Sequence, residues 1–373
     1  MSANAPLMIM AGGTGGHIFP ALAVAESVRA REIPVVWLGS RGGMETRLVP
    51  QHGIDIAALS GKGLRGKGAV ALLFAPFKLT IAVLQAVRAI LKYQPRAVLG
   101  LGGFASGPGG IAAWLLRKPL FVHEQNAIPG MTNRWLARIA RCVMAGFPTS
   151  FRMVAAGCPV VYTGNPVRRE IVALPPVAQR MADRIGAMRL LIIGGSLGAL
   201  RLNQVIPAAL AGLEGYDVEV WHQCGARHVD ITRQSYADAG VAARIEPFIE
   251  DMAEAYGWAD LVIARAGALT VAELIQVGVA ALLVPYPHAV DDHQTVNART
   301  LVDIGAARLM ADGELTPEAL SPVLTELLSD RTPLLRMAES SNSLKTPQSA
   351  EHVARICLGE MRCEDRMPTE IAS

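Results

Sequence analysis

Two short apolar runs in this chain each lead directly into a glycine-rich turn, and a helical segment follows each turn. Residues 6–11 precede GGTGG at 12–16, and residues 189–193 precede GGSLG at 194–198. After both turns, short apolar runs alternate with longer amphipathic segments, which is the pattern of buried parallel strands connected by helices. Glycine allows the tight strand-to-helix turn with which a doubly wound α/β sheet opens. The sequence therefore predicts an α/β chain with two such domains built alike.

The chain has 373 residues, more than one domain usually holds. GNP at 164–166 begins a proline-containing linker that runs to about Pro176. We therefore expect a first domain over residues 1–164 and a second domain from residue 165. Ligands of doubly wound sheets bind beyond the carboxyl ends of the strands. Because both glycine turns lie there, we expect them to face a ligand-binding cleft between the domains.

Composition excludes several other classes of protein. The formal net charge is +3, too small to predict nucleic-acid binding. The five cysteines are widely spaced and contain no CxxC pair, so we expect neither a disulfide framework nor a zinc site. The expected compartment is a reducing cytosol. The first apolar run lacks the flanks of a signal peptide and is too short to span a bilayer. A cytoplasmic or peripheral protein is therefore predicted.

A third glycine-rich segment, GGFASGP at 102–108, follows the apolar run 97–100. Such turns can bring backbone N–H groups and a partial positive charge to a phosphate, although a strand–helix turn also forms without a ligand. None of the three turns contains the Gly-Lys-Ser/Thr of a P-loop or the spacing GxGxxG. A P-loop ATPase and a nicotinamide dehydrogenase are therefore disfavoured, and no cofactor is predicted.

Candidate site residues, most of them polar or small, follow the ends of four of the predicted strands. They are His17, HEQN at 123–126, RAGALTVAE at 265–273 and DDHQ at 291–294. These positions suit catalysis or sugar binding, but a capping histidine, a polar loop or a glutamate that favours the helix dipole fits them as well. The chain has no Asp-x-Asp, so we expect hydrogen bonds to sugar hydroxyls or N-capping at 291–294 rather than a metal ion.

Eight motifs follow one another between residues 12 and 294. They are GGTGGH at 12–17, GGFASGP at 102–108, HEQN at 123–126, GNPVR at 164–168, GGSLGA at 194–199, FIEDM at 248–252, RAGALTVAE at 265–273 and DDHQ at 291–294. In this order they resemble the peptidoglycan N-acetylglucosaminyltransferases, a family of the GT-B class. Each motif alone is a weak signal, whereas the ordered set is specific.

The resemblance implies two Rossmann-like domains whose parallel sheets face each other across a cleft. A C-terminal helix and tail at 346–373 would pack back on the first domain. The second domain, residues 165–345, would bind UDP-N-acetylglucosamine, and the first an undecaprenyl-diphosphate-linked N-acetylmuramoyl-pentapeptide. The implied reaction transfers N-acetylglucosamine with inversion to the 4-hydroxyl of the muramoyl sugar, without a cofactor or metal ion.

The resemblance also implies roles for individual residues. Arg168 and the backbone of Ile249 match the family's uracil contacts, and Glu273 matches its ribose clamp. The diphosphate contacts are matched by Ser196, Ala268, Leu269 and Thr270, with Val271 and Ala272 beyond them. Asn126 and Gln294 match contacts to N-acetylglucosamine, and Thr14, Gly15 and Gly16 match further donor-site positions. The glycine turns of the first domain would meet the acceptor diphosphate.

The reaction needs a base for the acceptor hydroxyl. His17 is the first candidate, because an unperturbed imidazole titrates near neutral pH, and Glu124 is the second. We expect helix N-termini and Arg168 to stabilise the charge of the leaving UDP. Many family members have tyrosine where this chain has Phe104, so no role for that hydroxyl carries over.

Residues 69–91 are strongly apolar, but a proline and several polar side chains interrupt them, so no transmembrane helix is expected. Basic residues flank the segment, which is either a core helix or a helix on an anionic membrane surface. The resemblance favours a peripheral protein on the cytoplasmic face of the inner membrane. Two other functions stay open: a UDP-sugar epimerase on the same scaffold, and a UDP-sugar-binding protein without catalysis.

Overall fold

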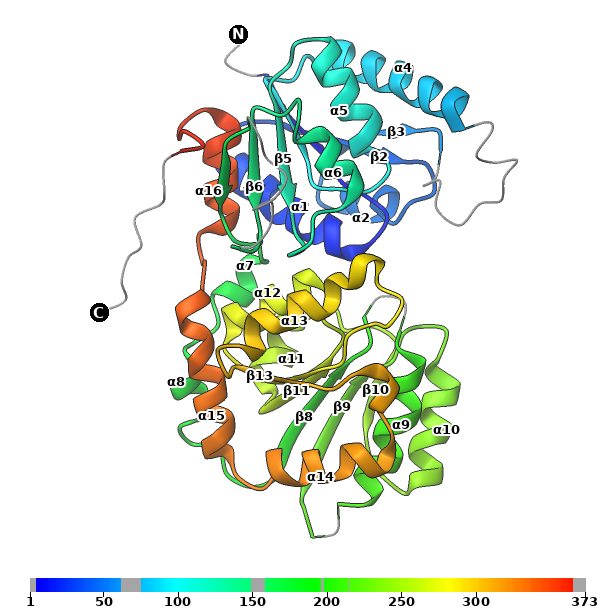
Figure 1. Ribbon diagram of the computed structural model, residues 1–373, viewed down its shortest axis with the longest axis vertical. Helices are drawn as coiled ribbons and strands as arrows, with labels where there is room; N and C mark the ends of the chain where they lie inside the picture. Colours follow the sequence, from blue (N-terminus) through cyan, green and yellow to red (C-terminus); the bar gives the residue numbers. More distant parts are fainter. Residues whose placement is uncertain (1–4, 62–74, 149–157, 196–197, 214, 365–373) are drawn as a thin grey trace. The chain divides into compact units, whose positions relative to one another are not determined.

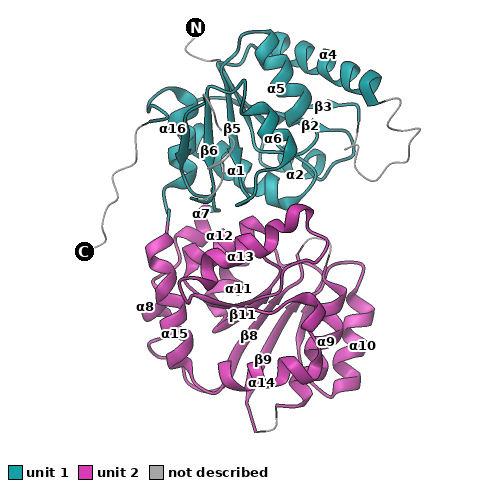
Figure 2. Cartoon of the chain, viewed as in Figure 1, with its two compact units in different colours: residues 1–168, 346–373 teal, residues 169–345 magenta. Residues whose placement is uncertain are grey.

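The computed structural model describes residues 5–61, 75–148, 158–195, 198–213 and 215–364. The chain forms two compact units, with Met1–Arg168 and Thr346–Ser373 in unit 1 and Arg169–Lys345 in unit 2 (Figure 2). The division falls after Arg168 rather than after Gly164. The intervening residues stay with unit 1 because the Gly164 carbonyl bonds to His123 and the Asn165 amide donates to the Gln125 carbonyl.

Unit 1 is built on a seven-stranded parallel sheet with the strand order β3-β2-β1-β4-β5-β6-β7 (Figure 1). Its strands are β1 (Leu7–Met10), β2 (Val35–Ser40), β3 (Asp55–Leu59), β4 (Ala97–Gly100), β5 (Leu120–Glu124), β6 (Cys142–Ala145) and β7 (Val160–Tyr162). Its described helices are α1 (Gly15–Arg29), α2 (Glu45–Gln51), α4 (Ala75–Tyr93), α5 (Ser106–Leu115), α6 (Met131–Leu136) and α16 (Ser349–Leu358). The order changes direction between β1 and β4, which creates a switch point at their carboxyl ends.

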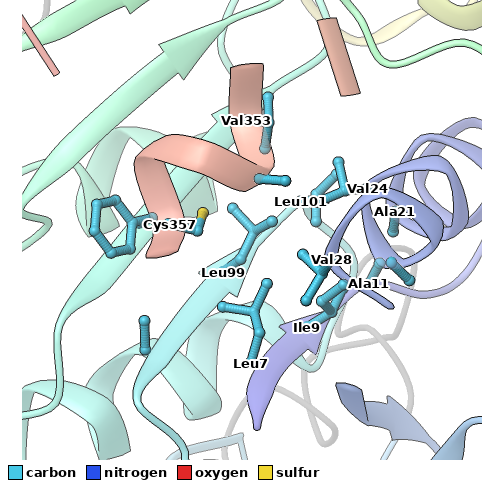
Figure 3. Packing of buried hydrophobic residues seen from close by; sticks show 14 of the residues in the cluster. Leu7, Ile9, Ala11, Ala21, Val24, Val28, Leu99, Leu101, Val353 and Cys357 are labelled. Carbon is cyan, nitrogen blue, oxygen red and sulfur yellow. The ribbon is translucent and has the colours of Figure 1, made fainter. Parts of the chain in front are cut away.

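Alternate residues of the central strands face opposite sides of this sheet and form two cores. On one side Leu7, Ile9 and Leu99 pack with α1 and α16, as Figure 3 shows. On the other side Met8 and Met10 pack with α4, α5 and α6. The C-terminal helix α16 is thus a structural layer of unit 1, although its sequence follows unit 2.

Unit 2 repeats the winding with a six-stranded parallel sheet in the order β10-β9-β8-β11-β12-β13. Its strands are β8 (Met188–Ile193), β9 (Val218–Gln223), β10 (Arg244–Glu246), β11 (Leu261–Ala264), β12 (Ala280–Leu283) and β13 (Ala307–Leu309). Its described α-helices are α7 (Arg169–Val172), α8 (Val177–Met181), α9 (Leu200–Ala211), α10 (Val229–Ala239), α11 (Met252–Trp258), α12 (Ala268–Val277), α13 (His293–Val302), α14 (Pro317–Leu327) and α15 (Arg331–Ser340). The switch point lies between β8 and β11.

The predicted fold class, two doubly wound domains with parallel sheets, is confirmed. Helix α1 begins at Gly15, inside the first glycine turn. Two edge strands, β7 and β13, were not predicted. Each has three residues, and so short a segment shows no apolar alternation from which a strand can be recognised.

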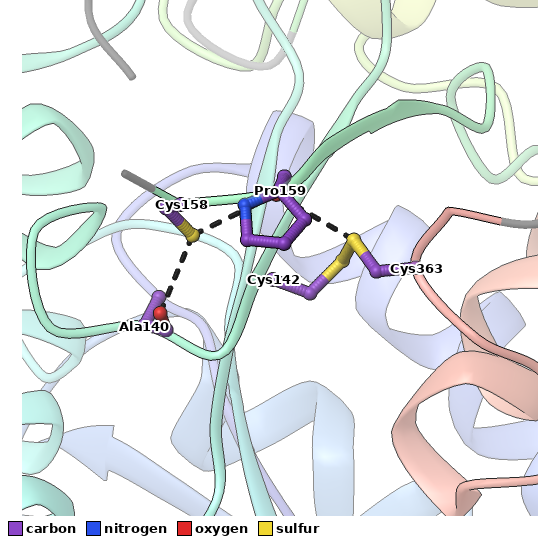
Figure 4. Close-up of a disulfide and its surroundings, with 5 residues drawn as sticks. All are labelled: Ala140, Cys142, Cys158, Pro159 and Cys363. Atoms are coloured by element: carbon purple, nitrogen blue, oxygen red, sulfur yellow. Dashed lines mark hydrogen bonds between the residues drawn. A yellow bond between two sulfur atoms is a disulfide. The ribbon is translucent and has the colours of Figure 1, made fainter. Parts of the chain in front are cut away.

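A disulfide joins Cys142, the first residue of β6, to Cys363, which follows α16 (Figure 4). The two Cα atoms are 6.0 Å apart although 221 residues separate them in sequence. The expectation that the cysteines form no disulfide is therefore wrong. The pair meets because α16 returns the chain to the sheet of unit 1, which cysteine spacing does not reveal. Cys158, Cys224 and Cys357 are free thiols.

Candidate functional site

The loops after β1 and β4 touch each other at the switch point of unit 1. Gly103 has φ +80°, and a Cβ on it would lie 2.4 Å from the carbonyl oxygen of Gly12. Gly13 has φ +91°. Only glycine permits this approach, because any side chain would push the two loops apart. The glycine turns therefore form one backbone-lined surface at the carboxyl ends of these strands.

The N-terminus of α1 belongs to this surface. Thr14 is the N-cap with extended backbone, and Gly15 and Gly16 are the first two helical residues. The first turn of the helix itself contains no acidic residue that would oppose the partial positive charge of the helix dipole. Arg168 lies beside the same helix, with its guanidinium carbon 4.9 Å from the centre of the Phe19 ring. The helix start and Arg168 together suit an anion.

A buried carboxylate that was not predicted holds the first glycine turn. Glu45 at the start of α2 is fully buried, and its Oε2 accepts the Gly13 N–H at 3.1 Å while Oε1 accepts the Ser40 N–H at 2.9 Å. A Cβ on Gly12, Gly39 or Gly43 would lie within 2.7 Å of the Glu45 side chain. Three glycines therefore make room for the carboxylate that fixes the turn.

His17, in the first turn of α1, is connected to the HEQN segment. Its Nδ1 lies 3.1 Å from Gln125 Oε1. Gln125 Nε2 lies 3.3 Å from His123 Nδ1, and His123 Nε2 lies 3.0 Å from the carbonyl oxygen of Gly164. His123 is fully buried, which lowers its pKa to about 4, so its ring is neutral at physiological pH.

Glu124 organises the loop that follows β5. Its Oε1 accepts the backbone and side-chain N–H groups of Asn126 at 2.9 and 3.1 Å. Its Oε2 accepts the Gly130 N–H at 3.0 Å and the Asn133 amide at 2.8 Å. The side chain is only 1 % exposed. Because each oxygen already accepts two hydrogen bonds, the geometry favours His17 over Glu124 as the group that takes a proton.

In unit 2, Gln223 holds the glycine turn after β8, as Glu45 holds the first glycine turn of unit 1. Its Oε1 accepts the Gly195 N–H at 2.9 Å, and its Nε2 donates to the carbonyls of Gly195 and Pro247 at 3.1 and 3.0 Å. A Cβ on Gly198, where φ is +76°, would lie 2.3 Å from the Cys224 carbonyl oxygen. The turn after β8 is thus clamped to the end of β9. Ser196, predicted in this turn, lies outside the described residues.

The predicted segment 268–273 forms the N-terminal half of α12. Gly267 is the N-cap, and the first turn, with Ala268, Leu269, Thr270 and Val271, contains no acidic residue. Ala272 and Glu273 follow, both buried, and Glu273 Oε2 accepts the hydroxyl of the buried Tyr256 at 3.0 Å. The helix start therefore combines an uncompensated dipole with a carboxylate whose orientation Tyr256 helps to fix.

Arg265, just before α12, ties the ends of two strands together. Its guanidinium donates to the carbonyls of Val284 and Pro285 at 3.2 Å and pairs with Asp312 at 2.6 Å. Nearby, Gln294 Oε1 accepts the Tyr286 N–H at 2.9 Å. These contacts give the loop after β12 a fixed shape.

The segment before Gln294 has strained backbone. Asp291 and Asp292 have φ of +54° and +51°, which non-glycine residues rarely adopt. Such strain is typical of functional loops. Thr295 donates to Asp292 Oδ1 at 2.7 Å. Among the described residues, no group of three or more His, Cys, Asp or Glu side chains is arranged to hold a metal ion.

The structure groups the predicted residues within each unit. In unit 1 the start of α1 holds Thr14, Gly15, Gly16 and His17, Glu124 and Asn126 lie at and just after the end of β5, and Arg168 lies beside Phe19 of α1. In unit 2 the segment after β10 holds Ile249, the first part of α12 holds Ala268, Leu269, Thr270, Val271, Ala272 and Glu273, and α13 holds Gln294. Ile249 follows β10 and is buried. Glu45 and Gln223 were not predicted, and Gln125 was predicted only as a member of the HEQN segment, without a role of its own. The signal for both glutamines was their place at a strand end.

Comparison with known proteins follows the same division. Residues 7–145 match the glycosyltransferase family 28 N-terminal domain, and residues 189–353 match the glycosyltransferase family 28 C-terminal domain. A protein of Marinobacter nauticus named UDP-N-acetylglucosamine–N-acetylmuramyl-(pentapeptide) pyrophosphoryl-undecaprenol N-acetylglucosamine transferase is 52% identical over 353 residues, which are 94% of this chain and 96% of that protein.

Solved structures agree with this comparison. The crystal structure of Acinetobacter baumannii MurG has a TM-score of 0.80 and 42% sequence identity, and the match covers 95% of this chain and 99% of that one. A putative UDP-N-acetylglucosamine 2-epimerase from Listeria monocytogenes has a TM-score of 0.69 at 16% identity, with 98% and 100% covered. The second likeness extends to the fold alone.

Proposed function

Because the chain belongs to the UDP-N-acetylglucosamine–N-acetylmuramyl-(pentapeptide) pyrophosphoryl-undecaprenol N-acetylglucosamine transferases, within glycosyltransferase family 28, we propose that it transfers N-acetylglucosamine from UDP-N-acetylglucosamine to a lipid-linked muramoyl-pentapeptide in peptidoglycan synthesis. The observation that carries the proposal is 52% identity spread over 94% of the chain. The enzyme is a hexosyltransferase. In the proposed reaction the 4-hydroxyl of the acceptor attacks the anomeric carbon with inversion.

Unit 2 binds the UDP-sugar in this proposal. The start of α12 points its dipole at the diphosphate, where the small residues allow close approach. Glu273 accepts the ribose hydroxyls, and the Tyr256 hydroxyl orients its carboxylate. The proposed diphosphate contacts are Ser196, Ala268, Leu269 and Thr270. Arg168 and the Ile249 backbone contact uracil, and Gln294 and Asn126 contact the sugar. Val271, Ala272, Thr14, Gly15 and Gly16 complete the proposed donor set.

Unit 1 supplies the acceptor site and the base. The glycine turns and the start of α1 hold the acceptor diphosphate through backbone N–H groups. His17 takes the proton of the 4-hydroxyl as the new glycosidic bond forms, and UDP leaves with the electrons of the bond that breaks. Glu124 shapes the loop that presents Asn126. We expect His17→Ala to lower kcat by about 100- to 10,000-fold, the range that general base catalysis contributes.

Exposed apolar side chains on three helices of unit 1 support peripheral attachment to a membrane. Helices α4, α5 and α6 cover the same face of the unit 1 sheet. Their exposed apolar side chains, each at least half exposed, are Phe77, Leu84, Leu91, Trp114, Leu115, Met131 and Trp135. Arg138 stacks over the Trp135 ring at 4.2 Å, and the same helices carry Lys78, Arg88, Lys92 and Arg134. No described helix has the length and apolar character needed to span a bilayer.

The proposed partner of this patch is the anionic lipid at the cytoplasmic face of the inner membrane, where apolar contact and cationic side chains act together. No nucleic-acid partner is proposed. In flotation with lipid vesicles, the double variant Phe77→Ser, Trp114→Ser should bind less than the wild type. Ile185→Ser, which removes an exposed apolar side chain of unit 2, is the matched control. Equal binding to neutral and anionic vesicles would remove the electrostatic part.

The function is tested by incubating the full chain with radiolabelled UDP-N-acetylglucosamine and a lipid-linked muramoyl-pentapeptide. Movement of label into the lipid phase supports the transferase. A new UDP-sugar that forms without acceptor would instead indicate an epimerase. Binding of the nucleotide without turnover would indicate a binding protein.

A further inference from the structure

The hydrogen bonds behind His17 form a chain whose direction is set at its buried end. The chain begins at the Gly164 carbonyl oxygen, which can only accept. His123 Nε2, at 3.0 Å, must therefore carry the proton and donate it. Because the buried His123 ring is neutral, its Nδ1 then holds a lone pair and can only accept.

The amide of Gln125 is oriented by two acceptors. Its Nε2 lies 3.3 Å from His123 Nδ1 and also 3.3 Å from the His123 carbonyl oxygen. The reverse orientation would place the amide oxygen against both acceptors and leave neither with a donor. Gln125 is only 1 % exposed, so water does not replace the missing bonds. The amide oxygen must consequently face His17.

This orientation determines which nitrogen of His17 carries the proton. Gln125 Oε1 is an acceptor, and His17 Nδ1 lies 3.1 Å from it, so Nδ1 carries the hydrogen. In the neutral ring the lone pair then resides on Nε2. The His17 ring also packs against Gly102, where an added Cβ would lie 2.7 Å from His17 Cε1. The glycine therefore permits the position of the ring, and Gln125 selects its tautomer.

We infer that Gln125 is a positioning residue that holds His17 in the tautomer whose Nε2 is free to remove the acceptor proton. The inference rests on the proposed function. In the step, the O–H bond of the 4-hydroxyl breaks and its proton moves to Nε2, while the oxygen forms the bond to the anomeric carbon and UDP leaves with the bonding electrons. The Nδ1–H bond to Gln125 stays intact throughout, so no rearrangement accompanies proton transfer.

Nuclear magnetic resonance of the full chain tests the tautomer directly. Long-range ¹H–¹⁵N correlation with ¹⁵N-labelled histidine, assigned through His17→Asn, should show Nδ1 protonated and Nε2 unprotonated in the wild type at high pH. An Nε2-protonated ring in the wild type overturns the inference. This measurement needs no turnover, so it is independent of whether the protein transfers sugar.

Substitution of Gln125 tests the consequence for turnover. Gln125→Leu should mix the two tautomers and lower kcat at least about 10-fold, within the contribution of general base catalysis. The KM for UDP-N-acetylglucosamine should stay unchanged. Gln51→Leu, at an exposed position of the same unit, is the matched control. An unchanged tautomer and kcat in Gln125→Leu would overturn the inference. Loss of sugar transfer by a wild type with the expected tautomer would count against the proposed function alone.

Discussion

Replacing Glu124 with glutamine separates an organising role from a catalytic one. Each carboxylate oxygen accepts one backbone N–H, from Asn126 or from Gly130, and one side-chain amide. A glutamine has a single amide oxygen. Whichever way it is turned, one of the two backbone N–H groups faces an NH₂ group and loses its acceptor. A buried donor without an acceptor costs about 1–3 kcal/mol, and loss of the charge adds to this.

We therefore expect Glu124→Gln to lower the free energy of unfolding by about 2–4 kcal/mol. For a unit of this size the thermal midpoint should fall by roughly 4–16 °C. Urea unfolding followed by circular dichroism measures the first quantity, and calorimetry the second. The exposed Glu32→Gln in the same unit is the control and should behave as the wild type. Unchanged stability combined with loss of kcat would refute the reasoning and identify Glu124 as the base.

Three further predictions follow from other parts of the molecule. Burial lowers the pKa of His123 to about 4 and of His222 to about 3, so below pH 6.5 the unfolded chain binds more protons than the folded chain. The free energy of unfolding should therefore fall as the pH drops from about 6.5 towards 4. An equal urea midpoint at pH 7 and pH 5 would contradict this. Non-reducing peptide mapping should recover Cys142 cross-linked to Cys363, and Cys363→Ser should abolish that species. Glu273→Ala should raise the KM for UDP-N-acetylglucosamine about 5- to 150-fold, whereas an unchanged KM argues against the ribose contact.

The sequence predicts the fold well because its signals are local. The apolar run before Gly12 and the one before Gly194 mark the first strand of each sheet, and the structure has β1 and β8 there. The residues that hold the glycine turns and His17 in place could not be predicted, because their contacts depend on distances between segments that are remote in sequence. Glu45 reaches Gly13 only through the packing of α2, and Gln125 meets His17 only because β5 ends where α1 begins, at the same edge of the sheet.

Both units hold the second glycine of their first turn in the same way. Gly13 and Gly195 have positive φ, and each donates its N–H to a buried side chain, that of Glu45 at the start of α2 in unit 1 and that of Gln223 at the end of β9 in unit 2. The two solutions differ in charge. A bond to a carboxylate is about twice as strong as a bond to a neutral amide, whereas Gln223 makes a second bond to its turn, to the carbonyl of Gly195.

The same carboxylate repels an anion bound at that turn, whereas the neutral Gln223 does not. In the proposed function, unit 2 must capture a soluble UDP-sugar, and attraction between its turn and the diphosphate contributes directly to affinity. In the same proposal, unit 1 receives an acceptor anchored in the membrane to which the enzyme attaches. Shared attachment raises the effective concentration of the acceptor, so the turn of unit 1 can favour a fixed geometry over anion affinity. The charge difference between Glu45 and Gln223 is thus what two substrates delivered in different ways would require.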